Sequence, residues 1–201
     1  MLAAYMPVWA QRNATVSEQE QVIREINLAA QQIQTLQCDF TQTKVLSILN
    51  DKLVSSGTMT FAQPSKLRWT YTTPYNYTLI ITDEKVHIAK GSKRNSIDVQ
   101  SSRFFQEIAQ MMAGSVTGKC LTQTQDFSVT MQMGDTYYIA VLTPKGKQLR
   151  KMFQKIRLTF DKTRKVVTQV ELTEPSGDTT QIVFQQIRQN QPVSDKTFTL
   201  D

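Results

Sequence analysis

The feature that most constrains how this chain can fold is a succession of short segments in which apolar and polar residues alternate. Each segment is rich in β-branched and aromatic residues, and turn residues separate it from the next. The segments cover residues 38–42, 77–82, 85–89, 127–133, 136–143, 155–161, 166–173 and 181–187, and residues 57–74 hold two more. Strands with such short connections are antiparallel, and a sheet of about ten of them curls because strands twist. The sequence therefore predicts a mainly β protein of the α+β class.

Two segments instead have the spacing of amphipathic helices. The first covers residues 18–35, where Ser17 and Glu20 match a capping box. Its apolar positions are Val22, Ile26, Ala29, Ile33 and Leu36. The second covers residues 102–113, and its apolar positions are Phe104, Phe105, Ile108, Met111 and Met112. A methionine-rich helix face either fills gaps in a core or adapts to varied apolar ligands. Helices across the open side of a curled sheet enclose a space, which either side chains or a ligand can fill.

Length and composition favour one soluble domain over residues 11–201, because 40% of the 201 residues are hydrophobic and no linker-like tract or repeat interrupts the chain. Residues 1–10 are apolar and end in Val8-Trp9-Ala10, a pattern typical of a signal-peptide cleavage site. We interpret them as a signal-peptide remnant that indicates export; a plain apolar tail is the alternative. Cys38 and Cys120 either form one long-range disulfide or remain two buried thiols.

Residues for catalysis or metal binding are scarce. The one histidine, His87, lies in a short strand where we expect it to face solvent. No HExxH, Cys-x-x-Cys, P-loop or GxSxG motif is present, and the acidic residues fall mostly in predicted turns. We therefore expect no enzyme activity, no metal and no cofactor.

Basic residues cluster in one segment, which matters because the net charge is +6. Residues 145–157 contain six cations and no acid: Lys145, Lys147, Arg150, Lys151, Lys155 and Arg157. Such a run is either a solvated hairpin face or a docking surface for an anionic membrane or an acidic partner. For docking we single out Lys147, Arg150 and Lys151. No nucleic-acid-binding motif accompanies the charge, so we expect no nucleic-acid partner.

A stripe of large apolar residues follows one face of two predicted strands. Met59 and Phe61 alternate with polar residues on the first strand, and Leu67, Trp69 and Tyr71 alternate on the second. A turn at residues 64–65 joins the two. Such a stripe normally belongs to a core, but in a curled sheet it can also line a cavity.

The order of the motifs resembles the periplasmic outer-membrane lipoprotein carrier family, LolA and its LolB-like relatives. The matching pieces run through nearly the whole chain: the N-terminal helix, residues 40–42, 57–64, 67–74 and 81–83, Leu142-Thr143-Pro144-Lys145, residues 156–160 and residues 180–184. The resemblance implies an incomplete, strongly curled antiparallel β-barrel of about ten to eleven strands, with helices covering its open concave side. It implies a monomeric periplasmic carrier that hides lipoprotein acyl chains in an apolar cavity between the inner and outer membranes.

The resemblance also assigns roles to residues. It places acyl-chain contacts at Phe40, Met59, Phe61, Leu67, Trp69, Tyr71, Phe105, Ile108 and Met112. It puts Leu67 near the mouth, where the family accepts cargo from an inner-membrane exporter. Gln63 stands where well-studied members have an arginine that contacts the lid before a conserved proline. The implied partners are acylated lipoproteins, the exporter, and an outer-membrane receptor or anionic membrane surface. A carrier or sensor of another lipid or glycolipid is the alternative function.

Overall fold

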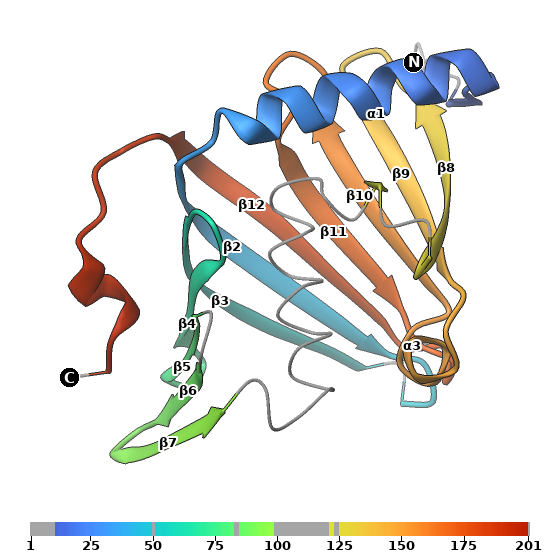
Figure 1. Ribbon diagram of the computed structural model, residues 1–201. Coiled ribbons are helices and arrows are strands. Elements are labelled where there is room, and N and C mark those ends of the chain that lie inside the picture. The colour runs from blue at the N-terminus through green and yellow to red at the C-terminus, as the bar shows by residue number, and fades with distance from the viewer. Residues whose placement is uncertain (1–10, 50, 83–84, 99–120, 123–124, 201) are drawn as a thin grey trace, which may run out of the picture.

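The computed structural model describes residues 11–49, 51–82, 85–98, 121–122 and 125–200. Twelve strands form one sheet in the order β1-β8-β9-β10-β11-β12-β2-β3-β4-β5-β6-β7. Their bounds are β1 Arg12–Asn13, β2 Thr35–Leu46, β3 Asp51–Ala62, β4 Lys66–Thr73, β5 Tyr77–Ile81, β6 Lys85–Lys90, β7 Lys93–Asp98, β8 Phe127–Met133, β9 Tyr137–Pro144, β10 Lys155–Asp161, β11 Val167–Thr173 and β12 Thr179–Gln189. Every neighbouring pair is antiparallel. The described sheet curls without closing (Figure 1), which confirms the predicted fold class.

A glycine allows β3 and β4 to come unusually close in the middle of the sheet. The register between these strands shifts between Ser56 and Gly57. A Cβ on Gly57 would lie 1.9 Å from the carbonyl oxygen of Thr70 and 2.9 Å from the ring of Phe40. Only a residue without a side chain fits there, and the irregularity adds to the local twist of the sheet.

One long helix, α1 (Val16–Gln31), lies across one end of strands β8 to β12 (Figure 1). Its capping box is formed by Thr15 and Glu18, two residues before the predicted Ser17 and Glu20. The helix also ends earlier than the predicted residue 35, because Asn190 binds the chain at both Gln32 and Gln34 and turns it into β2. The next two apolar positions of the pattern, Ile33 and Leu36, are still buried.

The basic segment is not a plain hairpin as the solvated-face interpretation assumed. Residues Lys147–Met152 form the short helix α3 between β9 and β10. The sequence pattern also missed β7, whose residues are mostly polar and do not alternate. Our predicted helix over residues 102–113 lies outside the described part of the chain.

A C-terminal segment covers the outer face of β4. It contains a 3₁₀ helix, η3 (Asp195–Phe198), with Phe198 buried. Arg68 donates hydrogen bonds to the carbonyls of Thr197 (2.9 Å) and Thr199 (3.3 Å). Arg68 therefore lies on the face opposite Leu67 and Trp69, as alternation along the strand requires.

Candidate lipid-binding site

The face of the sheet that packs with α1, which we call the inner face, carries three rows of apolar side chains across neighbouring strands. The first row is Leu36, Phe61, Leu67 and Ile81, and the second is Cys38, Met59, Trp69 and Leu79. The third is Phe40, Gly57, Tyr71 and Tyr77. The first row is fully buried, whereas Leu79, Tyr71 and Tyr77 are half-buried. Burial of these side chains thus decreases from the end of the sheet where β2 begins toward the end where β2 terminates.

Five aromatic rings make a continuous cluster on this face. The ring centroid of Phe40 lies 4.3 Å from that of Trp69 and 5.2 Å from that of Tyr71. Trp69 also meets Phe184 of β12 at 6.0 Å, and Tyr71 meets Tyr77 at 6.1 Å. These separations are typical of tilted and edge-to-face aromatic packing. The cluster links the buried interior to half-buried positions on β4 and β5.

Trp69 stands out within the cluster because of its polar atom. Its side chain is only 5% exposed, and its indole N–H makes no hydrogen bond of good geometry within the described part of the chain; it interacts weakly with the Tyr71 hydroxyl, which opposes the rise that burial causes in the Tyr71 pKa. Nearby Tyr71 has a partner, since its hydroxyl donates to the Gln42 side chain at 2.9 Å. A buried donor without an acceptor is energetically unfavourable and uncommon. Trp69 could therefore donate to an acceptor that a bound molecule supplies.

The apolar stripe of α1 covers one end of the inner face, across strands β8 to β12. Val22, Ile26 and Ala30 are buried, and the first two join the same cluster of buried residues as Phe40 and Trp69. The opposite side of the helix is solvent-exposed, as Leu28 shows. An acyl chain could reach the inner face under α1 only if these contacts separated, because protein interiors are closely packed.

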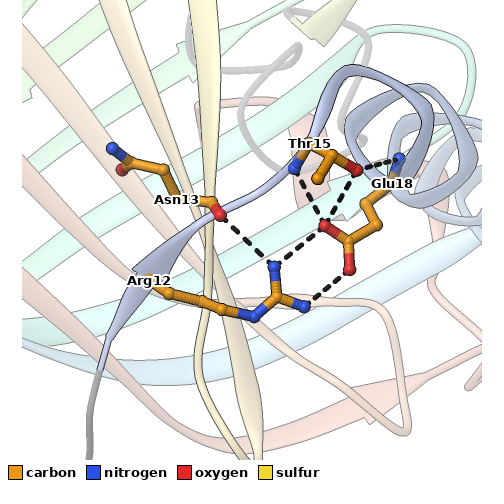
Figure 2. Close-up of polar contacts among 4 residues, drawn as sticks. All are labelled: Arg12, Asn13, Thr15 and Glu18. Carbon is orange, nitrogen blue, oxygen red and sulfur yellow. Dashed lines mark hydrogen bonds and ion pairs between the residues drawn. The ribbon is translucent and has the colours of Figure 1, made fainter.

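Polar contacts fasten the start of α1 to the edge of the sheet. Arg12 of β1 donates two hydrogen bonds to Glu18, at 2.9 and 2.6 Å, and Glu18 also accepts from the backbone N–H of Thr15 (Figure 2). These bonds, that of Arg12 above all, lower the pKa of Glu18 to about 2. The side chain of Gln19 bonds to β8 at Val129 and Met131. The first turn of α1 is therefore firmly attached.

The middle of α1 is held by an ion pair to the turn between β10 and β11. The ammonium of Lys165 lies 2.6 Å from a carboxylate oxygen of Glu25 and 4.7 Å from the ring centroid of Tyr138. The hydrogen bond from Lys165 lowers the pKa of Glu25. Glu25 and Lys165 are 140 residues apart, and no local pattern in the sequence pointed to their contact.

The end of α1 is held by amide side chains. Asn190 donates to the carbonyl of Gln32 at 3.0 Å and accepts from the N–H of Gln34 at 2.8 Å. Gln63, the position singled out for lid contact, places its side-chain nitrogen 3.5 Å from the carbonyl of Gln31. That distance is at the long limit of a hydrogen bond, so Gln63 contributes less here than Asn190.

The structure brings most of the predicted acyl-chain residues together. Phe40, Met59, Phe61, Leu67, Trp69 and Tyr71 share the inner face, whereas Phe105, Ile108 and Met112 lie outside the described residues. Leu67 is only 1% exposed, so its predicted docking role would require the site to open. The other predicted docking residues, Lys147, Arg150 and Lys151, are exposed on α3.

Other reactive groups form no second site in the part of the chain described. Cys38 is a free thiol whose burial raises its pKa to about 12, which makes it unreactive; Cys120 lies outside the described residues. His87 is half-buried and lies 2.7 Å from the Ser96 hydroxyl. Among the residues described, no cluster of metal ligands occurs, and no helix is long and apolar enough to cross a membrane.

An open, curled antiparallel sheet with an apolar, aromatic inner face, and a long helix fastened by polar contacts across one end, defines the fold class of this protein. Comparison of the sequence with known families narrows this class. The model of the outer membrane lipoprotein carrier protein LolA family matches residues 31–201. The chain belongs to this family.

Curated relatives agree with the assignment. The outer-membrane lipoprotein carrier protein of Chromobacterium violaceum is 29% identical over 162 residues, which cover 78% of this chain and 71% of the relative. The protein with the same description from Nitrosomonas europaea is 27% identical over 168 residues, covering 82% and 77%.

Solved structures share the fold at low sequence identity. The MucA/MucB complex of Pseudomonas aeruginosa contains a chain with a TM-score of 0.55 and 11% identity, covering 91% of this chain and 61% of that one. An uncharacterised conserved protein of Thermus thermophilus has a TM-score of 0.55 and 10% identity, covering 89% and 91%. At these identities the likeness extends to the fold only.

Proposed function

We propose that this protein is a periplasmic carrier that holds the acyl chains of lipoproteins between the inner face of the sheet and α1. It takes acylated lipoproteins from an inner-membrane exporter and delivers them to the outer membrane, and no bond is made or broken. Membership of the lipoprotein carrier family supports this proposal.

One structural observation carries the proposal: on the inner face the aromatic cluster passes from the buried Trp69 to the half-buried Tyr71 and Tyr77, and α1, which polar contacts hold across the end of β8 to β12, closes one end of this face. An acyl chain in water is unfavourable by about 0.8 kcal/mol for each CH₂ group. If α1 moves away, the inner face offers apolar surface to replace that water. The polar contacts of α1 can re-form when the lipid leaves, so binding is reversible.

The indole N–H of Trp69 gives the site a means of recognising the linkage of an acyl chain. Acyl chains of lipoproteins are attached through ester and amide groups, whose carbonyl oxygens are hydrogen-bond acceptors. A carbonyl beside Trp69 would give this N–H a hydrogen bond of good geometry, which the described residues do not provide. The cluster then supplies the apolar contacts, and Trp69 adds a polar one.

The test measures the binding of a synthetic triacylated peptide to wild type, Trp69→Phe and Trp69→Glu. Trp69→Phe keeps an aromatic ring but removes the N–H, so we expect about fivefold weaker binding, the equivalent of one hydrogen bond. Trp69→Glu places a carboxylate against acyl chains, so binding should be lost. Circular dichroism checks the fold of each variant.

Unchanged affinity in a folded Trp69→Glu variant would show that Trp69 does not line the lipid site. If Trp69→Glu unfolds the protein, the comparison rests on Trp69→Phe, which retains the buried ring. Equal affinity of Trp69→Phe and wild type would then exclude the proposed carbonyl contact.

A further inference from the structure

Four large apolar side chains are exposed at the tip of the hairpin formed by β2 and β3. Ile48 and Leu49 lie in the turn and are 88% and 70% exposed. Leu53 and Val54, near the start of β3, are 51% and 57% exposed. Consecutive strand residues point to opposite faces, so Leu53 and Val54 show that the hairpin is exposed on both faces. We call Ile48, Leu49, Leu53 and Val54 the hairpin tip.

The hairpin tip projects beyond β4 but has a fixed base. Pairing of β3 with β4 stops at Ser56, whereas β3 pairs with β2 as far as Asp51. At the base, Asp178 of the turn between β11 and β12 accepts hydrogen bonds from the N–H and the hydroxyl of Ser47, at 2.9 and 3.0 Å. These bonds lower the pKa of Asp178 and keep it charged. The hydrogen bonds between Ser47 and Asp178 therefore fix the position of the exposed hairpin tip.

A cationic patch, formed by Lys147, Arg150 and Lys151 of α3, lies at the same end of the sheet (Figure 1). One row of paired residues joins the two features: Val45 of β2 pairs with Thr179, Thr179 with Thr173, and Thr173 with Lys155 of β10. Three strand spacings separate β2 from β10, roughly 14 Å. The hairpin tip and the cationic patch can therefore contact one surface together.

The local balance of charge is positive. Two of the acids near the strand ends are engaged in ion pairs, since Glu174 pairs with Lys44 at 2.8 Å and Glu171 pairs with Arg157 at 3.0 Å. Asp51 and Asp126 are exposed acids at this end, but the cationic patch together with Lys52 outnumbers them. Asp178 accepts the bonds from Ser47. The three side chains of the cationic patch are exposed on a segment without acids. Together they favour an anionic surface.

We propose that this end of the molecule binds the surface of an anionic phospholipid membrane. The hairpin tip enters the boundary between headgroups and acyl chains, and the cationic patch contacts lipid phosphates. Exposed apolar side chains beside cations are the combination that holds proteins at membrane interfaces. A tip of four side chains is small for a stable protein–protein interface, which buries about 800 Å² on each partner.

The proposed docking also determines where α1 lies relative to the membrane. Lys165, which contacts α1, lies in the turn after β10, whereas α3 precedes β10, so α1 and the cationic patch lie at opposite ends of this strand. Docking through the hairpin tip would leave α1 away from the membrane. The proposal concerns the protein without cargo and holds whatever ligand the inner face takes.

The experiment measures cosedimentation of the cargo-free full chain with phosphatidylglycerol–phosphatidylethanolamine vesicles and with phosphatidylcholine vesicles. We expect binding to the anionic vesicles that weakens as salt rises. Ile48→Ser combined with Leu49→Ser should weaken binding at least about tenfold. Lys147→Gln combined with Lys151→Gln should weaken it about fivefold for each charge removed.

A matched control uses an exposed leucine and an exposed cation at the other end of the molecule. Leu28→Ser combined with Arg24→Gln on α1 should bind vesicles as tightly as wild type, because Leu28 is 63% exposed and both residues lie away from the hairpin tip. In a separate variant, Leu49→Trp, brominated lipids in anionic vesicles should quench the fluorescence of the added indole.

Three results would overturn the proposal: no binding of wild type to anionic vesicles at low salt, equal binding by the Ile48→Ser, Leu49→Ser variant, or no quenching of the indole at position 49. Retention of vesicle binding by that serine variant together with loss of binding to the inner-membrane exporter would assign the tip to a protein partner instead.

Discussion

The Glu25→Gln variant tests whether the contacts of α1 set the affinity for lipid. In the wild type the Glu25 carboxylate accepts from Lys165 at 2.6 Å, and the two side chains are 36% and 19% exposed. Exposed ion pairs contribute about 0.2–1 kcal/mol, and hydrogen bonds to charged groups about 1.5–3 kcal/mol. Because solvent reaches Glu25 but less of Lys165, we expect the pair to stabilise the closed position of α1 by about 1 kcal/mol.

The loss of 1 kcal/mol shifts the balance between closed and open α1 about fivefold. In the proposed mechanism the buried contacts of Val22 and Ile26 separate before lipid occupies the inner face, so the closed form competes with lipid. Glu25→Gln should therefore bind a triacylated peptide about fivefold more tightly, as measured by calorimetry at pH 7. Glu20→Gln is the control, because its exposed carboxylate pairs only loosely with Arg24, at 3.8 Å.

The pH dependence provides a second measurement. The bond from Lys165 lowers the pKa of Glu25 below its usual value of 4.5, so the ion pair contributes fully above that value. Its contribution is lost as the pH falls through the lowered pKa. Wild type and Glu25→Gln should then converge in acid. Weaker or unchanged binding by Glu25→Gln at pH 7 would refute the idea that closure of α1 competes with lipid.

Two further substitutions test the sheet and the end of α1. Gly57→Ala places a Cβ 1.9 Å from the Thr70 carbonyl oxygen. It should lower the free energy of unfolding, measured by urea titration, by about 3 kcal/mol. In the control, Gly146→Ala, the added Cβ meets no atom within 4 Å and should lower the free energy of unfolding by less than about 1 kcal/mol. Gln63→Arg should replace the 3.5 Å contact to Gln31 with charge-assisted hydrogen bonds of about 1–2 kcal/mol. Lipopeptide affinity should therefore weaken about five- to thirtyfold. Identical lipopeptide off-rates for the wild type and the variant would show that other residues hold α1.

Alternation in the sequence predicted the strands well where one face is buried and the other is not. Strands β8 and β10 begin and end at the predicted residues, 127–133 and 155–161. It failed for β7, because a polar edge strand has no buried face to impose alternation, and for α3, which is too short to show a helical period. The alternation of apolar and polar residues therefore reflects burial of one face of a strand, and elements with little burial were missed.

The site was predictable only in part, for a related reason. Phe40, Trp69 and Tyr71 could be placed on one face because spacing of two fixes the side of a strand. The cap of α1 was placed two residues late, because Thr15 with Glu18 and Ser17 with Glu20 both match the pattern. The hydrogen bond from Arg12 to Glu18 further stabilises the cap formed by Thr15 and Glu18 (Figure 2). Contacts such as Glu25 with Lys165 join distant parts of the chain and leave no local signal.

Native mass spectrometry of the protein purified from the periplasm of its own host would show directly whether it carries lipoprotein acyl chains. We expect a bound species whose mass corresponds to a diacylated or triacylated lipoprotein or peptide, displaced from the complex by excess synthetic lipopeptide. The Trp69→Glu protein, purified in parallel, should carry none. A bound glycolipid, or a wild-type protein that carries no acylated species, would contradict the proposed role as a lipoprotein carrier.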